Sequence, residues 1–323
     1  MNHADKNRTG ELARNVAVAL RFKQSQGTTD MPRVEKEVLA PNYDRVRGGN
    51  FHLATNARDQ TFPHPGMYLR TAFPDRVDVI EEVIAEGDRV GLLFRVTAAH
   101  TGNLFGIPPT GKKVDVYEMA MLRIVDGQMV EGWFMMDEAA LLLQLGATLP
   151  PRKDGQFIAP PLPVTGENAD ALAQRLAAKS PASQQDSNRL IAARSRSSAP
   201  SKAGRAADHR QKRFGFRHLR DYCKVHGLGE LALDAALPDR HDRIEVLIAE
   251  GDQVWMRFNT NGTQQASLCG LAPTGKRVGV PVVSVMKFTE GQWQESWTFA
   301  DDLGLLLQLG APDVLLQSPV PIK

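Results

Sequence analysis

The sequence predicts an α+β fold that is built twice in tandem, and three observations predict it. Residues 73–147 and 237–311 align without a gap at an offset of 164 residues, with 33 identities at 75 positions. In the first copy, strand-like runs follow segments with helical periodicity. The repeat offset is much longer than a solenoid repeat, which spans roughly 20–50 residues, so each copy is a domain of its own. Helices followed by an antiparallel meander indicate a curved sheet wrapped around helices.

The elements of the first copy follow from spacing and turn residues. Apolar residues at helical spacing predict the helices, and Pro41 is expected to end the second of them. Asp126-Gly127 is typical of a hairpin turn, and Gly146 is typical of a helix C-cap. We expect helices at 12–24, 33–39, 65–72 and 138–145, and strands at 77–85, 89–98, 113–125 and 128–136.

The second copy keeps the sheet pattern, but its N-terminal part differs from that of the first copy. Residues 149–166 contain five prolines and are expected to form a stiff linker between a domain at 1–148 and a domain at 167–323. Residues 168–178 are the expected counterpart of the first helix, and 206–225 have a helical, basic character. A Ser- and Ala-rich segment leads into a stretch near 195–205 that we expect to be mobile.

Composition excludes several classes of protein. Hydrophobic residues make up 42% and charged residues 24%, as in a globular protein, and the formal charge is only +2. This balance argues against a membrane-surface or nucleic-acid binder, and no apolar run approaches the roughly 18 residues of a membrane span. The N-terminus lacks a secretory pattern, so we expect a cytoplasmic protein. Two cysteines are too few for a disulfide framework, and Cys269 is expected to be a small buried apolar residue.

One segment is locally basic. Residues 189–224 contain 11 Lys and Arg but only two acids, Asp208 and Asp221. This segment could hold an acidic protein or a nucleic acid. A solvated helix face beside a loop explains the same composition, and we favour that explanation.

Several motifs occur in order in the first copy and in part in the second: AFPD, EGDRV, HTGNLFGIPPTGKKV, DGQMVEGW and LLLQLG. Together they resemble the SnoaL-like polyketide cyclase (ester cyclase) family, which has the nuclear-transport-factor-like fold. The resemblance implies two cone-shaped α+β barrels, each around one apolar cavity. It also implies pairing of the two sheets into an intramolecular pseudo-dimer, with further association into a homo-oligomer left open.

The resemblance further implies a reaction. Members of this family close a small carbonyl compound by an intramolecular aldol step, with a carboxylate as acid/base and with no metal or organic cofactor. The family's histidine and aspartate flank a tryptophan, but this chain has EGWF at 131–134 and ESWT at 295–298. Two hypotheses therefore stand: a cyclase-type enzyme working in the first copy, and a small-molecule-binding or scaffold protein that has lost the catalytic set.

Three residues of the first copy are candidates for the chemistry. Strand alternation and the resemblance place Glu118 on the inward face, where burial would raise its pKa into a range useful for proton transfer. The alternatives are that Glu118 faces water or pairs with an arginine. His100 could orient a carbonyl group, or it could bond to its own loop. Asp137 is a candidate acid, although a helix N-cap explains it better.

The remaining candidates would form the walls and entrance of the cavity. Phe134 and Met136 share the proposed inward face of their strand, and His52 and His64 precede the third helix. No spacing of histidines and acids matches a metal site, and GIPPTGK lacks the phosphate-loop pattern. The expected substrate-contacting residues are Phe134, Met136, Met119, Met121, Tyr117, Trp133, His64 and His52.

Overall fold

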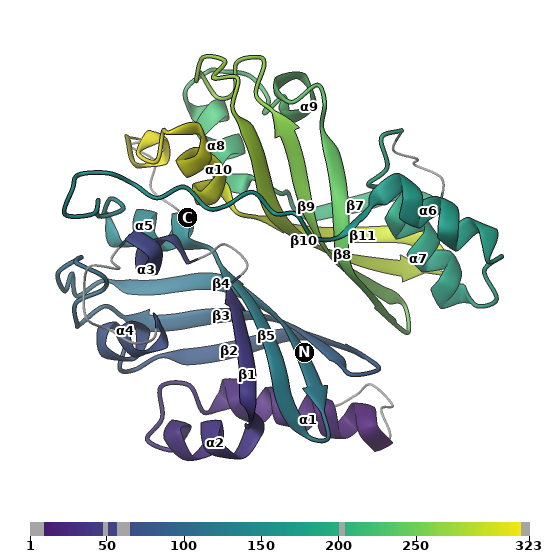
Figure 1. The fold of residues 1–323 in the computed structure, drawn as a ribbon, viewed down its shortest axis with the longest axis horizontal. Coiled ribbons are helices and arrows are strands. Elements are labelled where there is room, and N and C mark those ends of the chain that lie inside the picture. Colours follow the sequence, from purple (N-terminus) through teal and green to yellow (C-terminus); the bar gives the residue numbers. More distant parts are fainter. Residues whose placement is uncertain (1–9, 48–50, 57–64, 200–203, 318–323) are drawn as a thin grey trace. The chain divides into compact units, whose positions relative to one another are not determined.

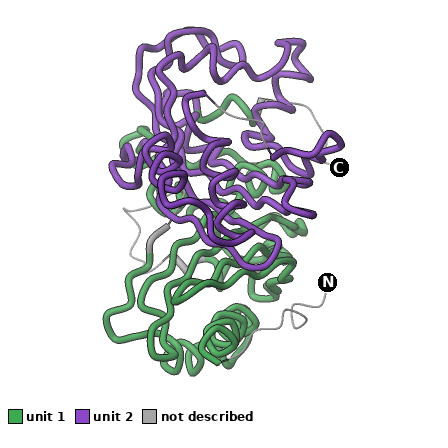
Figure 2. Tube along the Cα trace, turned by 90° about the vertical axis from the view of Figure 1, so that its right-hand side faces the viewer, with its two compact units in different colours: residues 1–158, 312–323 green, residues 159–311 purple. Residues whose placement is uncertain are grey.

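The structure is a computed structural model that describes residues 10–47, 51–56, 65–199 and 204–317. The chain forms two compact units, shown in Figure 2. Unit 1 holds the described residues of 1–158 and 312–323, and unit 2 holds the described residues of 159–311. The final described helix, a 3-10 turn at Val314–Gln317, packs on α5 (Glu138–Leu145) of unit 1. The last segment of the chain therefore returns to the first unit.

Unit 1 is a five-stranded sheet with the order β1-β5-β4-β3-β2 (Figure 1). Helix α1 (Gly10–Gln24) crosses one face of this sheet and packs against β2 to β5. Neighbouring strands are antiparallel except for β1, which runs parallel to β5. The strands are β1 Leu39–Arg47, β2 Val77–Glu86, β3 Arg89–Ala99, β4 Lys113–Val125 and β5 Gln128–Met136. The other helices are α2 Met31–Val38, α3 His52–Asn56 and α4 Pro65–Ala72.

Unit 2 repeats the plan with six strands in the order β6-β8-β9-β10-β11-β7. Its strand β7 runs parallel to β11, as β1 runs parallel to β5 in unit 1. The strands are β6 Glu167–Asn168, β7 Arg205–Arg213, β8 His241–Glu250, β9 Gln253–Thr263, β10 Arg277–Thr289 and β11 Gln292–Ala300. The helices are α6 Ala169–Ala178, α7 Gln184–Arg194, α8 Arg217–Val225, α9 Leu233–Ala236 and α10 Asp302–Leu309.

The two sheets bend at matching positions. The register of β2 on β3 shifts between Ile80 and Glu82, and that of β8 on β9 shifts between Ile244 and Val246, exactly one repeat later in the alignment. A second matched shift lies in the β4/β5 and β10/β11 pairs. Bulges of this kind bend a strand and increase its twist, so both sheets curve alike. The predicted tandem α+β fold is confirmed.

Two predictions about the elements were wrong. Residues 206–225 do not form one helix, because 205–213 pair with β11 as strand β7 and only 217–225 are helical. Pro41 does not simply end a helix, since it lies inside strand β1, which the sequence did not predict. Both strands lie at the edge of a sheet and pair through one side only, where proline and charged residues are tolerated.

The cysteines also differ from expectation. Cys223 of α8 forms a disulfide with Cys269, which is only half-buried, so Cys269 is not an isolated apolar residue. The bridge joins α8 to the loop that follows β9. Disulfides persist mainly in oxidising compartments, so the bridge gives the cytoplasmic expectation no support. Among the described helices, none has both the length and the apolar character needed to cross a membrane.

Candidate functional site

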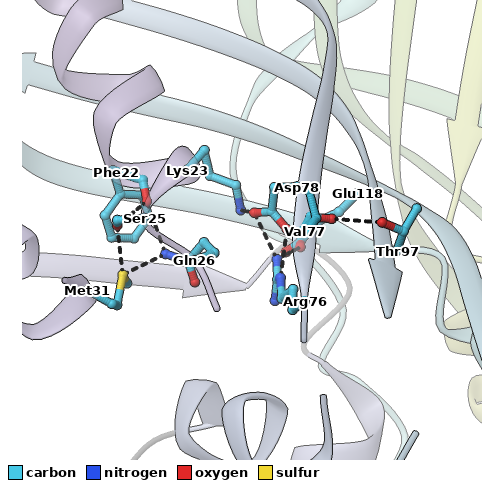
Figure 3. Close-up of polar contacts among 10 residues, drawn as sticks. All are labelled: Phe22, Lys23, Ser25, Gln26, Met31, Arg76, Val77, Asp78, Thr97 and Glu118. Carbon is cyan, nitrogen blue, oxygen red and sulfur yellow. Dashed lines mark hydrogen bonds and ion pairs between the residues drawn. The ribbon is translucent and has the colours of Figure 1, made fainter. Parts of the chain in front are cut away.

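The interior of unit 1 contains a cluster of four charged side chains (Figure 3). The Lys23 ammonium, near the end of α1, lies 2.7 Å from Oδ2 of Asp78. Arg76 donates through Nε to Oδ1 of Asp78 at 2.7 Å and through Nη2 to Oε2 of Glu118 at 3.1 Å. None of the four side chains is more than 7% exposed. We call these four residues the unit 1 ion cluster.

Burial and charge oppose each other in this cluster. Burial lowers the pKa of Lys23, and the nearby carboxylates offset only part of that effect. For Asp78, burial acts to raise the pKa, but the charges of Arg76 and Lys23 outweigh it and hold the pKa below its ordinary value. Burial also disfavours the charge on Arg76, yet Asp78 and Glu118 keep its pKa raised. The cluster is thus two cations matched to two anions, which is how a buried charge is tolerated.

Little free space remains beside the ion cluster among the described residues of unit 1. The cavity that Lys23, Arg76 and Glu118 line has a volume of about 10 Å³. A single water needs about that much, whereas a ligand pocket usually has roughly 300–1,000 Å³. Glu118 is the one predicted site residue among the described residues lining this cavity. Its carboxylate pairs with an arginine, which was one of the alternatives open from the sequence.

No predicted wall residue within the described ranges lines this cavity, although the Phe134 ring lies 5.6 Å from the Lys23 ammonium. Phe134 is buried on β5, with its ring centroid 6.4 Å from that of Phe22, and Trp133 and Met136 are buried on the same strand. His52 is buried in α3, and its backbone N–H donates to Oε2 of Glu138 at 2.7 Å. Met119 and Met121 are buried on β4, where Tyr117 is half-buried, and His64 lies outside the described residues. Their contact with a substrate stays a prediction.

His100 holds the loop that follows β3. Its Nδ1 accepts the backbone N–H of Thr110 at 3.3 Å and lies 3.1 Å from the hydroxyl of the same residue. Burial lowers the pKa of His100, which favours the neutral ring. In unit 2, Gln264 makes the matching contacts, because its Oε1 accepts from the backbone and the hydroxyl of Thr274. The contacts repeat in the absence of an imidazole, so this position closes the loop in both units.

Asp137 caps α5, as the sequence favoured. Its carboxylate accepts the backbone N–H of Ala140 at 3.0 Å. Asp301 does the same for Gly304 at the start of α10, at 2.8 Å. An N-cap side chain that accepts a hydrogen bond from the backbone N–H three residues further along the chain satisfies one of the unpaired N–H groups in the first turn of the helix. The cap accounts for the presence of aspartate in both copies.

Unit 2 contains a cavity of about 590 Å³, within the usual range for a small-molecule site. Its apolar lining includes Phe214, Phe216, Leu231, Leu233 and Phe258, and its charged lining includes Arg196, Arg220, Arg240, Asp234 and Asp242. Asp234 is 85% exposed in its side chain, so the cavity reaches solvent beside it. An apolar wall with a few charged groups is typical of a ligand pocket.

The charged wall of this cavity repeats much of the unit 1 ion cluster. The repeat offset of 164 relates three pairs of positions that keep their residue type, Arg76 with Arg240, Asp78 with Asp242, and Phe94 with Phe258. Arg240 lies 3.3 Å from Oδ2 of Asp242, and Arg196 lies 3.9 Å from the same atom. The Arg196 guanidinium stands 5.1 Å over the Phe258 ring, and Lys23 stands 3.8 Å over Phe94. Arg196 thus takes the place of Lys23, although it follows α7 in a different segment.

Two residues that line the cavity of unit 2 differ from their equivalents in unit 1. Val282 stands where unit 1 has Glu118, and Thr298 stands where unit 1 has Phe134. Both Val282 and Thr298 line the unit 2 cavity. Val282 lacks the carboxylate and Thr298 lacks the aromatic ring of the unit 1 residue, so unit 2 has less negative charge and less side-chain bulk at these two positions.

The basic segment does not form a separate patch. Arg196 and Arg220 line the cavity, and Arg210 and Lys212 lie 3.6 Å and 3.4 Å from the carboxylate of Glu295. The Arg213 guanidinium stands 5.4 Å from the ring of Trp297. Several of its cations therefore have partners within unit 2.

Sequence reasoning missed most of these charged residues. The signal was present, because PDRVD and PDRHD keep the arginine and aspartate of both copies at the start of β2 and β8. Lys23 and Arg196 carried no such signal, since they come from segments that do not align. Within the described ranges, no three His, Cys, Asp or Glu side chains are grouped as a metal site requires.

The comparisons with known proteins agree with the duplication. The model of the family described as "SnoaL-like polyketide cyclase" matches residues 67–145 and again residues 231–309. Both repeats are similar to the SnoaL-like polyketide cyclase family. The match covers strands β2 to β5 and β8 to β11, the loop at 100–112 with its counterpart, and the capped helix of each copy, including both aspartate caps.

Solved structures of single SnoaL-like proteins match less than half of this chain. One from Jannaschia sp. CCS1, described as a SnoaL-like polyketide cyclase, is 28% identical over 45% of this chain and 99% of its own, with a TM-score of 0.38. AclR of Streptomyces galilaeus, described as a hydroxylase, is 28% identical over 42% and 98%, with a TM-score of 0.35. IdmH of Streptomyces antibioticus, described as a polyketide cyclase, is 20% identical over 41% and 99%, with a TM-score of 0.34. The comparison with curated proteins gives no match.

Proposed function

We propose that this SnoaL-like protein binds a small organic molecule in the cavity of unit 2, and that the ion cluster of unit 1 is structural. The observation that carries the proposal is the contrast in volume, about 590 Å³ against about 10 Å³. Among the described residues of unit 1, the space beside the four paired charges is too small for a ligand. A cavity of several hundred cubic ångströms with both apolar and charged walls fits a molecule of one or a few rings.

Titration calorimetry with 2-naphthamide, a neutral aromatic amide, tests this proposal. Wild-type protein is expected to bind one molecule per chain. Thr298→Phe puts into unit 2 the residue that unit 1 has at the equivalent position, Phe134, and the added bulk should weaken binding at least tenfold. Glu118→Gln is the matched control in unit 1 and should leave binding unchanged. Binding that survives Thr298→Phe, or a wild type that binds neither 2-naphthamide nor its carboxylate analogue 2-naphthoate, would overturn the proposal.

A second candidate function is proton transfer in the same cavity. Asp242 is buried, and its Oδ1 accepts no hydrogen bond in the described part of the chain, while both arginines approach Oδ2. A carboxylate oxygen in a closed, partly apolar site can remove a proton next to a carbonyl group. In an aldol closure that carbon attacks a second carbonyl, a C–C bond forms, and the new alkoxide takes up the proton.

The two candidate acids can be compared directly. Incubation with a synthetic β-polyketo methyl ester, followed by absorbance of the aromatic product, measures the closure. If unit 2 catalyses it, Asp242→Asn abolishes turnover and Glu118→Gln does not. If the predicted Glu118 is the acid/base, the pattern reverses. Equal turnover in both variants and wild type would remove both residues from the reaction.

A further inference from the structure

In unit 1, a side-chain carboxylate occupies a position whose equivalent in unit 2 carries no charged side chain. In the unit 1 ion cluster the charges cancel, with Lys23 and Arg76 against Asp78 and Glu118. Glu118 reaches the cluster from β4 and accepts a hydrogen bond from Arg76. The side chain of Glu118 thus shows where a carboxylate sits when it completes this arrangement of cations.

Unit 2 keeps the cations and lacks that carboxylate. Arg196 and Arg240 supply two positive charges, and Asp242 supplies one negative charge at a side-chain exposure of 3%. The position equivalent to Glu118 is Val282. Among the described residues that line the cavity, Arg196 and Arg240 therefore carry one positive charge more than the buried Asp242 balances.

The other charged groups of the cavity do not remove this excess. Arg240 also pairs with Asp234, but that carboxylate is largely exposed and solvent screens it. Arg220 adds a further cation on the same cavity and donates through Nε to the carbonyl of Gly215. His241 lines the cavity as well, with its Nδ1 3.2 Å from the carbonyl of Asp239.

The Arg196 side chain lines the cavity and is 24% exposed. Its Nε is covered and has no hydrogen-bond partner within the described ranges. Burial lowers the pKa of Arg196, and the carboxylates of Asp242 and Asp234 offset only part of that effect. The guanidinium also stands over the Phe258 ring. A guanidinium in this setting gains two strong, directional hydrogen bonds from a carboxylate. Phe214, Phe216 and Leu231 also line the cavity and offer an apolar surface to the rest of a ligand.

Resting on the proposed binding function, we infer that the ligand of unit 2 is an aromatic or alicyclic carboxylic acid. Its carboxylate lies against Arg196 and Arg240, beside Val282, where unit 1 holds the carboxylate of Glu118. Its apolar body lies against the phenylalanines and leucines of the cavity. In unit 2, the carboxylate of the ligand thereby takes the position that the side-chain carboxylate of Glu118 has in unit 1.

Paired probes of equal size test the charge separately from binding. Calorimetry at low salt compares 2-naphthoate with 2-naphthamide. Wild-type protein is expected to bind the carboxylate at least tenfold more tightly than the amide. Equal affinities would overturn the inference while leaving the binding function intact, and absence of binding by both probes would overturn the proposed function itself.

A substitution that restores the internal carboxylate makes the test specific to this place. Val282→Glu should abolish the preference for 2-naphthoate, because the new side chain neutralises the arginines. Val282→Gln adds the same bulk without charge and should keep the preference. If the two variants lose it equally, the inference is wrong. Arg196→Gln provides a second route if Val282→Glu does not fold, and it should reduce 2-naphthoate binding at least tenfold while 2-naphthamide binding changes little.

Discussion

Replacing Asp78 by asparagine perturbs the unit 1 ion cluster at its centre. Asp78 accepts from both cations, with the Lys23 and Arg76 nitrogens at 2.7 Å from its two oxygens. Asparagine keeps the size of the side chain and removes its charge. Lys23 then loses its ion-pair partner inside the protein, and Arg76 retains only Glu118.

The cost follows from burial. Removing one member of a buried ion pair costs about 3–5 kcal/mol, because the remaining charge is neither solvated nor paired. The control is Asp88→Asn, which breaks the pair that Asp88 forms with Arg123 at the same 2.7 Å. Those two side chains are 43% and 40% exposed, and exposed pairs contribute only about 0–1 kcal/mol.

Native-state hydrogen exchange measures the loss in each unit separately, which a single melting curve of a two-unit chain does not. In Asp78→Asn, exchange of the β2 to β4 amides should accelerate roughly 10²–10³-fold, since about 1.4 kcal/mol is a factor of ten. Amides of β8 to β10 should not change. An effect no larger than that of Asp88→Asn would refute the idea that paired charges hold the unit 1 interior closed.

Three further predictions concern pH and the disulfide. The pKa of Asp78 is lowered in the folded protein, so its stabilising effect is present above the unfolded-state pKa of about 3.9 and is lost as pH falls through the folded value. The stability of unit 1 in Asp78→Asn should therefore depend less on pH in the acid range than it does in the wild type. The pKa of His100 is also lowered, so stability declines as pH falls below the unfolded-state value of about 6.5; His100→Gln should make unit 1 less sensitive between pH 7 and 5, and equal pH profiles would contradict this. Cys223 and Cys269 close a loop of 46 residues, for which the chain-entropy model gives about 4 kcal/mol; dithiothreitol should accelerate native-state hydrogen exchange of the unit 2 amides, and Cys223→Ser should show no further change on reduction.

Much of the fold was predictable because the duplication exposes it. The four strands of the first copy lie within one residue of their predicted ends, since hairpin turns and helix caps mark them in both copies. Strands β1 and β7 were missed because they are edge strands that depend on pairing with a distant strand. Local propensity alone does not reveal such pairing.

The site was harder to predict than the fold. Alternation along β4 gave the inward direction of Glu118, but not the Arg76 side chain that meets it. The cations Lys23 and Arg196 reach equivalent places from segments that do not align, so no comparison of the two copies could pair them. Thr298 and Val282, which are smaller than their unit 1 counterparts, line the cavity of unit 2, and a volume of this kind follows from packing rather than from spacing.

A crystal structure of the protein with 2-naphthoate tests the central claim most directly. The account predicts the naphthyl ring inside unit 2 and the carboxylate within hydrogen-bond distance of Arg196 or Arg240, with the unit 1 ion cluster unchanged. A ligand bound beside Glu118 in an opened unit 1, or an occupied unit 2 cavity with the carboxylate turned away from both arginines, would contradict it.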